Sequence, residues 1–199
     1  MGSKEINLKE KIRLALTSTS KVISEDLGLK NEYSDNKKSK DLNLINIDNL
    51  TNPSDFIRLR AETDSAALKK KFSNNIIYKK NLPSNNSSKS LYNIAEKIRY
   101  EVLGGKMLRG IEKNLNENYI QILNRKRKDQ LKTKEDVTIT EAFELYMIKN
   151  FHKIQLNSLT TKMLAFWEKD FEKSIDKHKK FLEKNLEDQN NYSERFSQI

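Results

Sequence analysis

The sequence predicts a mainly α-helical protein, folded as one or more irregular multi-helix domains. Five glycines and two prolines among 199 residues are too few for the many tight turns of a β-sandwich or barrel. Apolar residues instead recur every three or four positions along most of the chain, which is the spacing of one helix face. The only β-structure that we expect is a short β-hairpin near residues 27–47, where apolar stretches flank a polar one.

The N-terminal helices are expected where capping residues precede apolar stripes. Residues 7–10, Asn-Leu-Lys-Glu, have the pattern of a capping box and predict the first helix, which Gly28 is expected to end. Asn52 and Pro53 predict the next helix start, because asparagine caps well and proline suits the first helical position. Asp64 is expected to interrupt this helix and to cap a second piece.

The clearest predicted helix lies near the middle of the chain. Its apolar stripe consists of Leu91, Ile94, Ala95, Ile98 and Val102. Gly104 and Gly105 are expected to end it, since glycine readily adopts the left-handed conformation of a helix C-cap. A further helix is predicted from about Met107 into the basic segment at residues 125–128.

A predicted linker at residues 132–136 divides the chain. It separates an N-terminal helical region, residues 1–131, from a C-terminal helical region, residues 137–199. Thr138 and Glu141 form a second capping box, which predicts the first helix of the C-terminal region.

The chain's one tryptophan, Trp167, is predicted to lie in the core of the C-terminal region. We expect it to contact apolar residues such as Phe143 and Met147. Buried aromatic side chains dominate the packing of small cores, so this interpretation is favoured over an exposed binding residue.

No catalytic or metal-binding pattern is present in the sequence. There is no cysteine, no Gly-rich phosphate-binding loop and no H-x-x-x-H zinc pattern. His152 and His178 are 26 positions apart, and each is interpreted as a surface residue. We therefore predict that the chain carries no catalytic residue, no metal ligand and no bound cofactor.

The net charge of +10 raises the alternative of a basic helical nucleic-acid-binding protein. Concentrated positive charge occurs at residues 69–71 and 125–128, but neither run is interleaved with the aromatic residues of a base-stacking surface. A solvated helix face is therefore the favoured interpretation of both runs. Residues 1–10 are polar, and no apolar run approaches the length of a membrane span, so a cytoplasmic location without membrane contact is expected.

One stretch resembles a known family. Residues 60–68, Arg-Ala-Glu-Thr-Asp-Ser-Ala-Ala-Leu, are similar to the R-x-x-x-D-S-x-A-L segment of CobT-type cobaltochelatase subunits. Residues 96–104 resemble the E-x-x-R-x-E-x-x-G run of that family, and Asn114 with Leu115 resembles the N-L that follows it. Weaker likeness covers most of the chain.

The chain also departs from the family pattern. Ala61 stands where family members tend to have glycine, and Ser73 and Tyr78 stand where they tend to have histidine. No role of those histidines is carried over. The likeness is to the N-terminal region only, without the C-terminal von Willebrand A domain of the family.

The resemblance implies a non-catalytic subunit or domain of an ATP-dependent cobaltochelatase in cobalamin biosynthesis. Such a subunit would work in a hetero-oligomer with an AAA+ ATPase subunit, which uses ATP-Mg, and a large subunit, which holds the corrinoid ring and the cobalt. The chain would help to couple ATP hydrolysis to cobalt insertion. The same ATPase pair could instead act as a chaperone on another client, and the sequence does not separate these two alternatives.

The resemblance also implies a set of partner-binding residues. They are Arg60, Asp64, Ser65, Glu96, Arg99 and Glu101. Each has an ordinary structural interpretation beside the functional one. Arg60 and Asp64 are four positions apart and Glu96 and Arg99 three apart, which are the spacings of ion pairs on one helix.

Overall fold

The computed structural model describes residues 3–28, 50, 52–126 and 133–199, and their side chains from residue 8 onward. Its helices are α1 (Ser3–Ser24), α2 (Pro53–Phe72), α3 (Asn75–Lys80), α4 (Asn86–Met107), α5 (Arg109–Asn124), α6 (Ile139–Met147), α7 (Ser158–Ala165), α8 (Glu168–Lys184) and α9 (Gln189–Ser197). A short 3₁₀ turn, η2 (Lys134–Asp136), and a π-helical turn, η3 (Ile148–His152), complete the series. The described residues contain no strand, which confirms the mainly helical prediction. Almost all of the hairpin expected near residues 27–47 lies outside them.

Two predicted helix starts are confirmed by their cap geometry. The side chain of Asn52 accepts a hydrogen bond of 3.0 Å from the backbone N–H of Asp55, and Pro53 takes the first position of α2. Thr138 and Glu141 form the reciprocal capping box at the start of α6. These side chains satisfy backbone donors that have no partner within the helix.

Other predicted boundaries are wrong. The first helix begins at Ser3, before residues 7–10, and ends at Ser24, before Gly28. The chain turns at Glu25, whose φ of 55° is left-handed. Asp64 does not interrupt α2, because its carboxylate is buried against α5 and does not cap a helix N-terminus.

Gly104 and Gly105 do not end α4, which continues to Met107. A Cβ atom at Gly104 would lie 2.3 Å from Cδ1 of Leu68, a residue with no exposed surface in the C-terminal part of α2. Glycine at this position therefore lets α2 and α4 approach closely, which is a packing role and not a capping role.

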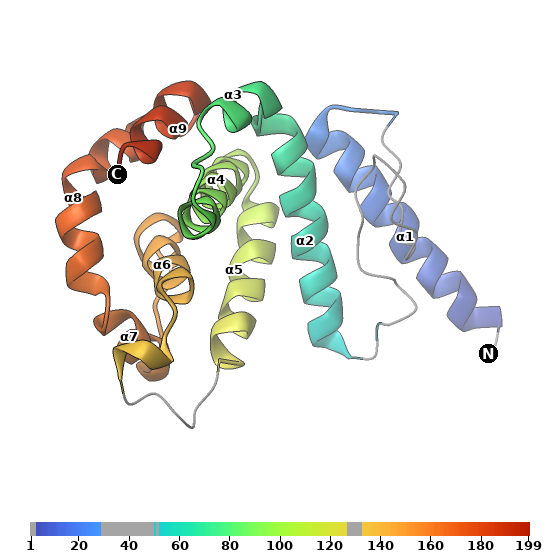
Figure 1. Ribbon diagram of the computed structural model, residues 1–199. Coiled ribbons are helices and arrows are strands. Elements are labelled where there is room, and N and C mark those ends of the chain that lie inside the picture. The colour runs from blue at the N-terminus through green and yellow to red at the C-terminus, as the bar shows by residue number, and fades with distance from the viewer. Residues whose placement is uncertain (1–2, 29–49, 51, 127–132) are drawn as a thin grey trace.

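The helix α4 runs through the middle of the molecule (Figure 1). It contacts α2 and α5 on one side and α6, η3 and α9 on the other. Helix α1 lies at the edge against α2. The largest core cluster joins residues of both predicted regions, for example Tyr92 and Ile98 of α4 with Phe143 of α6 and Phe171 of α8. Residues 1–131 and 137–199 are thus in direct contact, and their division into domains stays a prediction.

Trp167 is partly buried at the margin of this core. Its Nε1 donates a hydrogen bond of 2.9 Å to the carbonyl oxygen of Val137, and its ring is stacked on Phe171 at 6.4 Å between centroids. His152 differs from its prediction as a surface residue, because only 5% of its side chain is exposed. The reason is η3, whose wider turn ends at Lys153 with a left-handed φ of 57°. No described helix is long and apolar enough to cross a membrane.

Candidate functional site

Three of the predicted partner-binding residues lie on α4, and all three are buried. Glu96, Arg99 and Glu101 are 3%, 0% and 1% exposed. Charged side chains are rarely buried unless they are paired and hydrogen-bonded. Their partners separate them into two groups, one directed towards α9 and one towards α2 and α5.

The first group, here called the Arg99 joint, consists of Glu96, Arg99, Gln189 and Ser193. Arg99 donates to the carbonyl oxygen of Leu186 at 2.9 Å (Nη1) and to that of Phe72 at 2.6 Å (Nη2). These carbonyls lie at or just after the C-terminal ends of α8 and α2, where backbone acceptors lack helical partners.

Glu96 supplies the negative charge of the joint. Its Oε2 lies 3.4 Å from Nη2 of Arg99 and accepts a 3.0 Å hydrogen bond from Gln189, while Oε1 accepts one of 2.6 Å from Ser193. The cation with its acceptors and the anion with its donors are therefore all supplied within the fold. The Arg99 joint fastens α2, α4, α8 and α9 together.

The second group, here called the Glu101 cluster, consists of Ser65, Glu101, Tyr119 and His152. The hydroxyl of Ser65 donates to Oε1 of Glu101, and that of Tyr119 donates to Oε2 at 2.6 Å. Nε2 of His152 lies 3.4 Å from the same Oε2, without the alignment of a hydrogen bond. One carboxylate thus connects α2, α4, α5 and η3.

Glu101 is ionised although it is buried. Burial alone would raise its pKa, but the charge of Lys97 and the interactions with His152 and Ser65 outweigh burial and hold the pKa below the ordinary value of 4.5. The pKa of Tyr119 is raised by burial and by the neighbouring Glu101 carboxylate. The phenol therefore stays neutral and donates its proton to the hydrogen bond.

The Glu101 cluster opens into a pocket of about 210 Å³ between α2, α4 and α5. Ser65, Glu101 and Tyr119 are among its lining residues. Further lining residues carry charges of both signs: Glu62, Lys69 and Lys97. Nζ of Lys97 lies 5.3 Å from the centre of the Tyr119 ring. Burial raises the pKa of Glu62, against the lowering effect of Arg58 and Lys97.

Asp64 and Arg60 do not form the helical ion pair that their spacing suggested. Asp64 is 1% exposed and accepts a 2.6 Å hydrogen bond from Asn114 of α5. Burial raises its pKa, while Asn114 and the more distant charge of Arg60 lower it. Arg60 is exposed and does not line the pocket.

The structure therefore divides the six predicted residues among four places. Ser65 and Glu101 line the pocket, Asp64 joins α2 to α5, Glu96 and Arg99 form the joint with α9, and Arg60 is on the surface. Whether they bind a partner stays a prediction.

Sequence reasoning missed several residues of the site. Tyr119 could have been found, because it continues the series of Ile111 and Leu115 at four-residue spacing along α5. Glu62 is exposed and Lys97 is half-buried, and neither has a distinguishing sequence pattern. His152 reaches the cluster only through the π-helical turn η3, which the sequence does not announce.

Two further features bear on the predicted chemistry. Among the described residues, no group of three or more His, Cys, Asp or Glu side chains could hold a metal ion. In the basic segment, Arg125 is exposed and Lys126 lies 3.6 Å from Glu141, whereas residues 127 and 128 fall outside the described part. Neither basic residue lines the pocket.

Comparison with known proteins identifies the family. No curated protein and no solved structure matches the chain. The family described as "Cobalamin biosynthesis protein CobT" matches residues 7–199, which include both the Arg99 joint and the Glu101 cluster. Since the match covers nearly the whole sequence, the chain belongs to the CobT family of cobalamin biosynthesis proteins.

Proposed function

We propose that this chain is a non-catalytic component of an ATP-dependent cobaltochelatase that binds an AAA+ ATPase and helps to couple ATP hydrolysis to cobalt insertion into a corrinoid ring. Membership of the CobT family supports the cobalamin role. The observation that carries the contact is the ionised Glu101 in the wall of a pocket, within the residues 60–115 that most resemble the family. ATP-Mg would be used by the partner, and cobalt would be a substrate held elsewhere.

The pocket suits one inserted side chain of a protein better than a free metabolite. Its volume of about 210 Å³ is below the range of roughly 300–1,000 Å³ that is usual for small-molecule sites. A donor group of the partner, such as a guanidinium or an amide, could reach Glu101. Glu62, Lys69 and Lys97 would then pair with opposite charges around it, which favours a defined orientation of the partner.

The chemistry of the Glu101 cluster supports binding and not catalysis. A general base works best when its pKa lies near the working pH. The pKa of Glu101 is lowered, so this carboxylate is a poor acceptor for the hydroxyl proton of Ser65. A fixed negative charge in the wall of a pocket is instead a strong recognition element for a hydrogen-bond donor.

The test is a titration of the full chain against the AAA+ ATPase subunit. The double variant Glu62→Gln/Lys69→Gln removes one negative and one positive charge from the pocket rim, so the net charge is unchanged. It leaves the residues of the Glu101 cluster unaltered. We expect the Kd to rise about tenfold, the scale of an interface hot spot. The double variant Glu112→Gln/Lys113→Gln changes the same residue types on an exposed part of α5 and should bind within about twofold of the unmodified chain.

A quadruple alanine variant of residues 125–128 completes the comparison, with circular dichroism to verify that every variant keeps its helices. Loss of binding in this variant alone would assign the contact to the basic segment and overturn the proposal. An equal loss in both double variants would show a diffuse charge effect, which is also incompatible with a pocket-centred contact.

A further inference from the structure

The outer face of α8 carries a straight row of positive charges for which the described part of the chain supplies no ion pair within 4 Å. Its lysines, here called the lysine stripe, are Lys169, Lys173, Lys177, Lys180 and Lys184, and all five are exposed. Their spacing of four, four, three and four residues places them on one side of the helix over a length of about 22 Å. None of these lysines lines the Glu101 pocket.

Four of the carboxylates of α8 are bound to other elements and do not neutralise this stripe. Glu168 pairs with Lys149, Asp170 with Lys134 and Glu183 with Lys153, at 2.6, 2.6 and 3.1 Å. Asp176 accepts a 2.7 Å hydrogen bond from the hydroxyl of Tyr146. The remaining carboxylate, Glu172, is exposed and lies three residues after Lys169, so it offsets part of the charge at one end of the stripe. The fold thus uses most acidic residues of α8 to hold the helix in place, and the stripe keeps an excess of positive charge.

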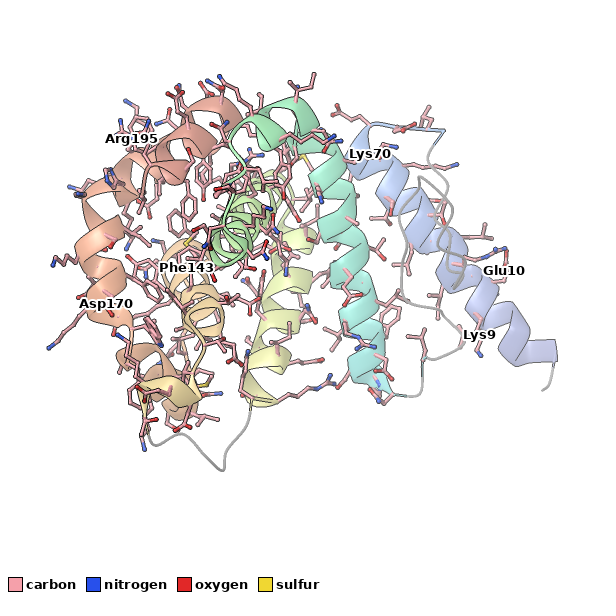
Figure 2. The ribbon with its side chains drawn as sticks, in the orientation of Figure 1. Lys9, Glu10, Lys70, Phe143, Asp170 and Arg195 are labelled. Carbon is pink, nitrogen blue, oxygen red and sulfur yellow. The ribbon has the colours of Figure 1, made fainter. Side chains whose placement is uncertain are left out.

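An apolar groove lies beside the lysine stripe. Its volume is about 440 Å³, and α4, α6, α8 and α9 each contribute to its lining. Aromatic side chains dominate it: Phe143, Trp167, Phe171 and Phe196. Figure 2 shows Phe143 inside the helices and Asp170 on the outer side of α8.

The groove and the stripe share a border. Asp170 and Ser174 of α8 line the groove, and each lies three residues before a stripe lysine, Lys173 and Lys177 respectively. Residues three apart are neighbours on a helix surface. A molecule seated in the groove therefore meets the lysines along one edge.

We propose that this groove and the lysine stripe together bind an acidic amphipathic helix of a partner protein. Apolar side chains of such a helix would enter the groove between the aromatic rings. Its carboxylates, repeating every three to four residues, would follow the same helical period as the lysines. The surface is separate from the Glu101 pocket, which lies between α2, α4 and α5, so the proposal does not depend on the proposed function.

Other anionic partners fit this surface less well. Single-stranded nucleic acid is bound by basic residues interleaved with several exposed aromatic rings. Phe181 is the one exposed aromatic residue among the described residues of α8, and the guanidinium of Arg195 already lies over its ring. A membrane-surface helix inserts protruding apolar side chains, whereas Phe143 and Phe171 are buried. An acidic amphipathic helix matches both parts of the surface, because its apolar side chains fit the groove and its carboxylates face the lysine stripe.

The experiment is a display selection of random 16-residue peptides on the full chain. We expect the enriched peptides to combine Asp or Glu at helical spacing with aromatic or leucine residues on the adjacent face. A synthetic copy of the most enriched peptide is then titrated against the chain and its variants. Enrichment of basic or uncharged peptides, or of none, would overturn the proposal.

Two pairs of variants locate the binding surface. The quadruple change of Lys169, Lys173, Lys177 and Lys180 to Gln should weaken binding about tenfold at low salt, with a smaller loss at high salt as the charges are screened. The matched control changes the exposed Lys79, Lys80, Lys106 and Lys162 to Gln, with the same loss of net charge, and should bind within about twofold.

The second pair tests the groove without altering charge. Ser174→Trp fills the groove and should reduce binding, whereas Thr161→Trp on the exposed side of α7 should not. Equal losses in a variant and its control would contradict the assignment. The assignment would also be contradicted if single-stranded DNA bound the unmodified chain, bound the lysine-stripe variant more weakly and was not displaced by the peptide.

Discussion

The Arg99 joint and the Glu101 cluster place two carboxylates five residues apart on the same helix, and they use them differently. In the joint, the charge of Glu96 is matched by Arg99, and both are hydrogen-bonded to residues of the fold. In the cluster, Glu101 accepts hydrogen bonds from the neutral hydroxyls of Ser65 and Tyr119, and the cation that most lowers its pKa is Lys97, which lines the pocket. Burial of a charged residue therefore does not indicate its role. What differs between the two groups is where the compensating charge lies, buried beside Glu96 in the joint and in the pocket lining near Glu101 in the cluster.

The largest effect that separates the two groups is expected from Arg99→Met. The change leaves the Glu96 carboxylate buried without its cation and frees the carbonyl oxygens of Phe72 and Leu186. We expect the free energy of unfolding, measured with urea, to fall by about 3–5 kcal/mol. Adding Glu96→Gln to this variant should recover part of the loss, because the uncompensated charge disappears. If the double variant were less stable than Arg99→Met alone, the attraction between Glu96 and Arg99 would not be what stabilises the joint.

A smaller loss is expected where α2 and α4 meet, at the contact that brings Ser65 to Glu101. Gly104→Ala would place a Cβ atom 2.3 Å from Cδ1 of the buried Leu68 and should cost about 1–3 kcal/mol of stability. Gly110→Ala is the matched control, since a Cβ there meets nothing within 4 Å, and it should leave stability unchanged or raise it by up to about 1 kcal/mol, because alanine favours the helix. Equal effects of the two variants would mean that this close approach of the helices is not needed.

The helices themselves were predictable because their signals are local. Asn52 and Thr138 cap helices as their side-chain chemistry requires. Of the apolar stripe predicted for α4, Ala95 and Ile98 are buried, and Leu91, Ile94 and Val102 are partly buried against the core. The ends were less predictable. Gly104 looks like a helix terminator in sequence, but its role is set by Leu68, which is distant in the chain.

The site was only partly predictable for a related reason. The resemblance identified Ser65 and Glu101, but it could not say that these residues share a pocket while Glu96 and Arg99 face α9. That division depends on which neighbouring helix each side chain meets. His152 reaches the site because η3 is a π-helical turn. The sequence contains no pattern from which that turn could be predicted.

The central claim, that Glu101 is a buried anion balanced from the pocket rim, also determines the pH dependence of stability. Because the folded pKa is lowered, the contribution of Glu101 is complete above its ordinary pKa of 4.5 and is lost as the pH falls towards the folded value. Glu101→Gln should therefore remove part of the acid-induced loss of unfolding free energy between pH 5 and pH 3.

The most direct measurement is the titration of the Glu101 carboxyl carbon by NMR, in the unmodified chain and in Lys97→Gln. We predict a pKa below 4.5 in the unmodified chain and a higher pKa in the variant, because the rim cation is the largest influence that lowers it. A Glu101 pKa at or above 4.5, or one that Lys97→Gln leaves unchanged, would contradict the claim that the charge of Glu101 is compensated by a cation in the pocket lining, unlike that of Glu96 in the Arg99 joint.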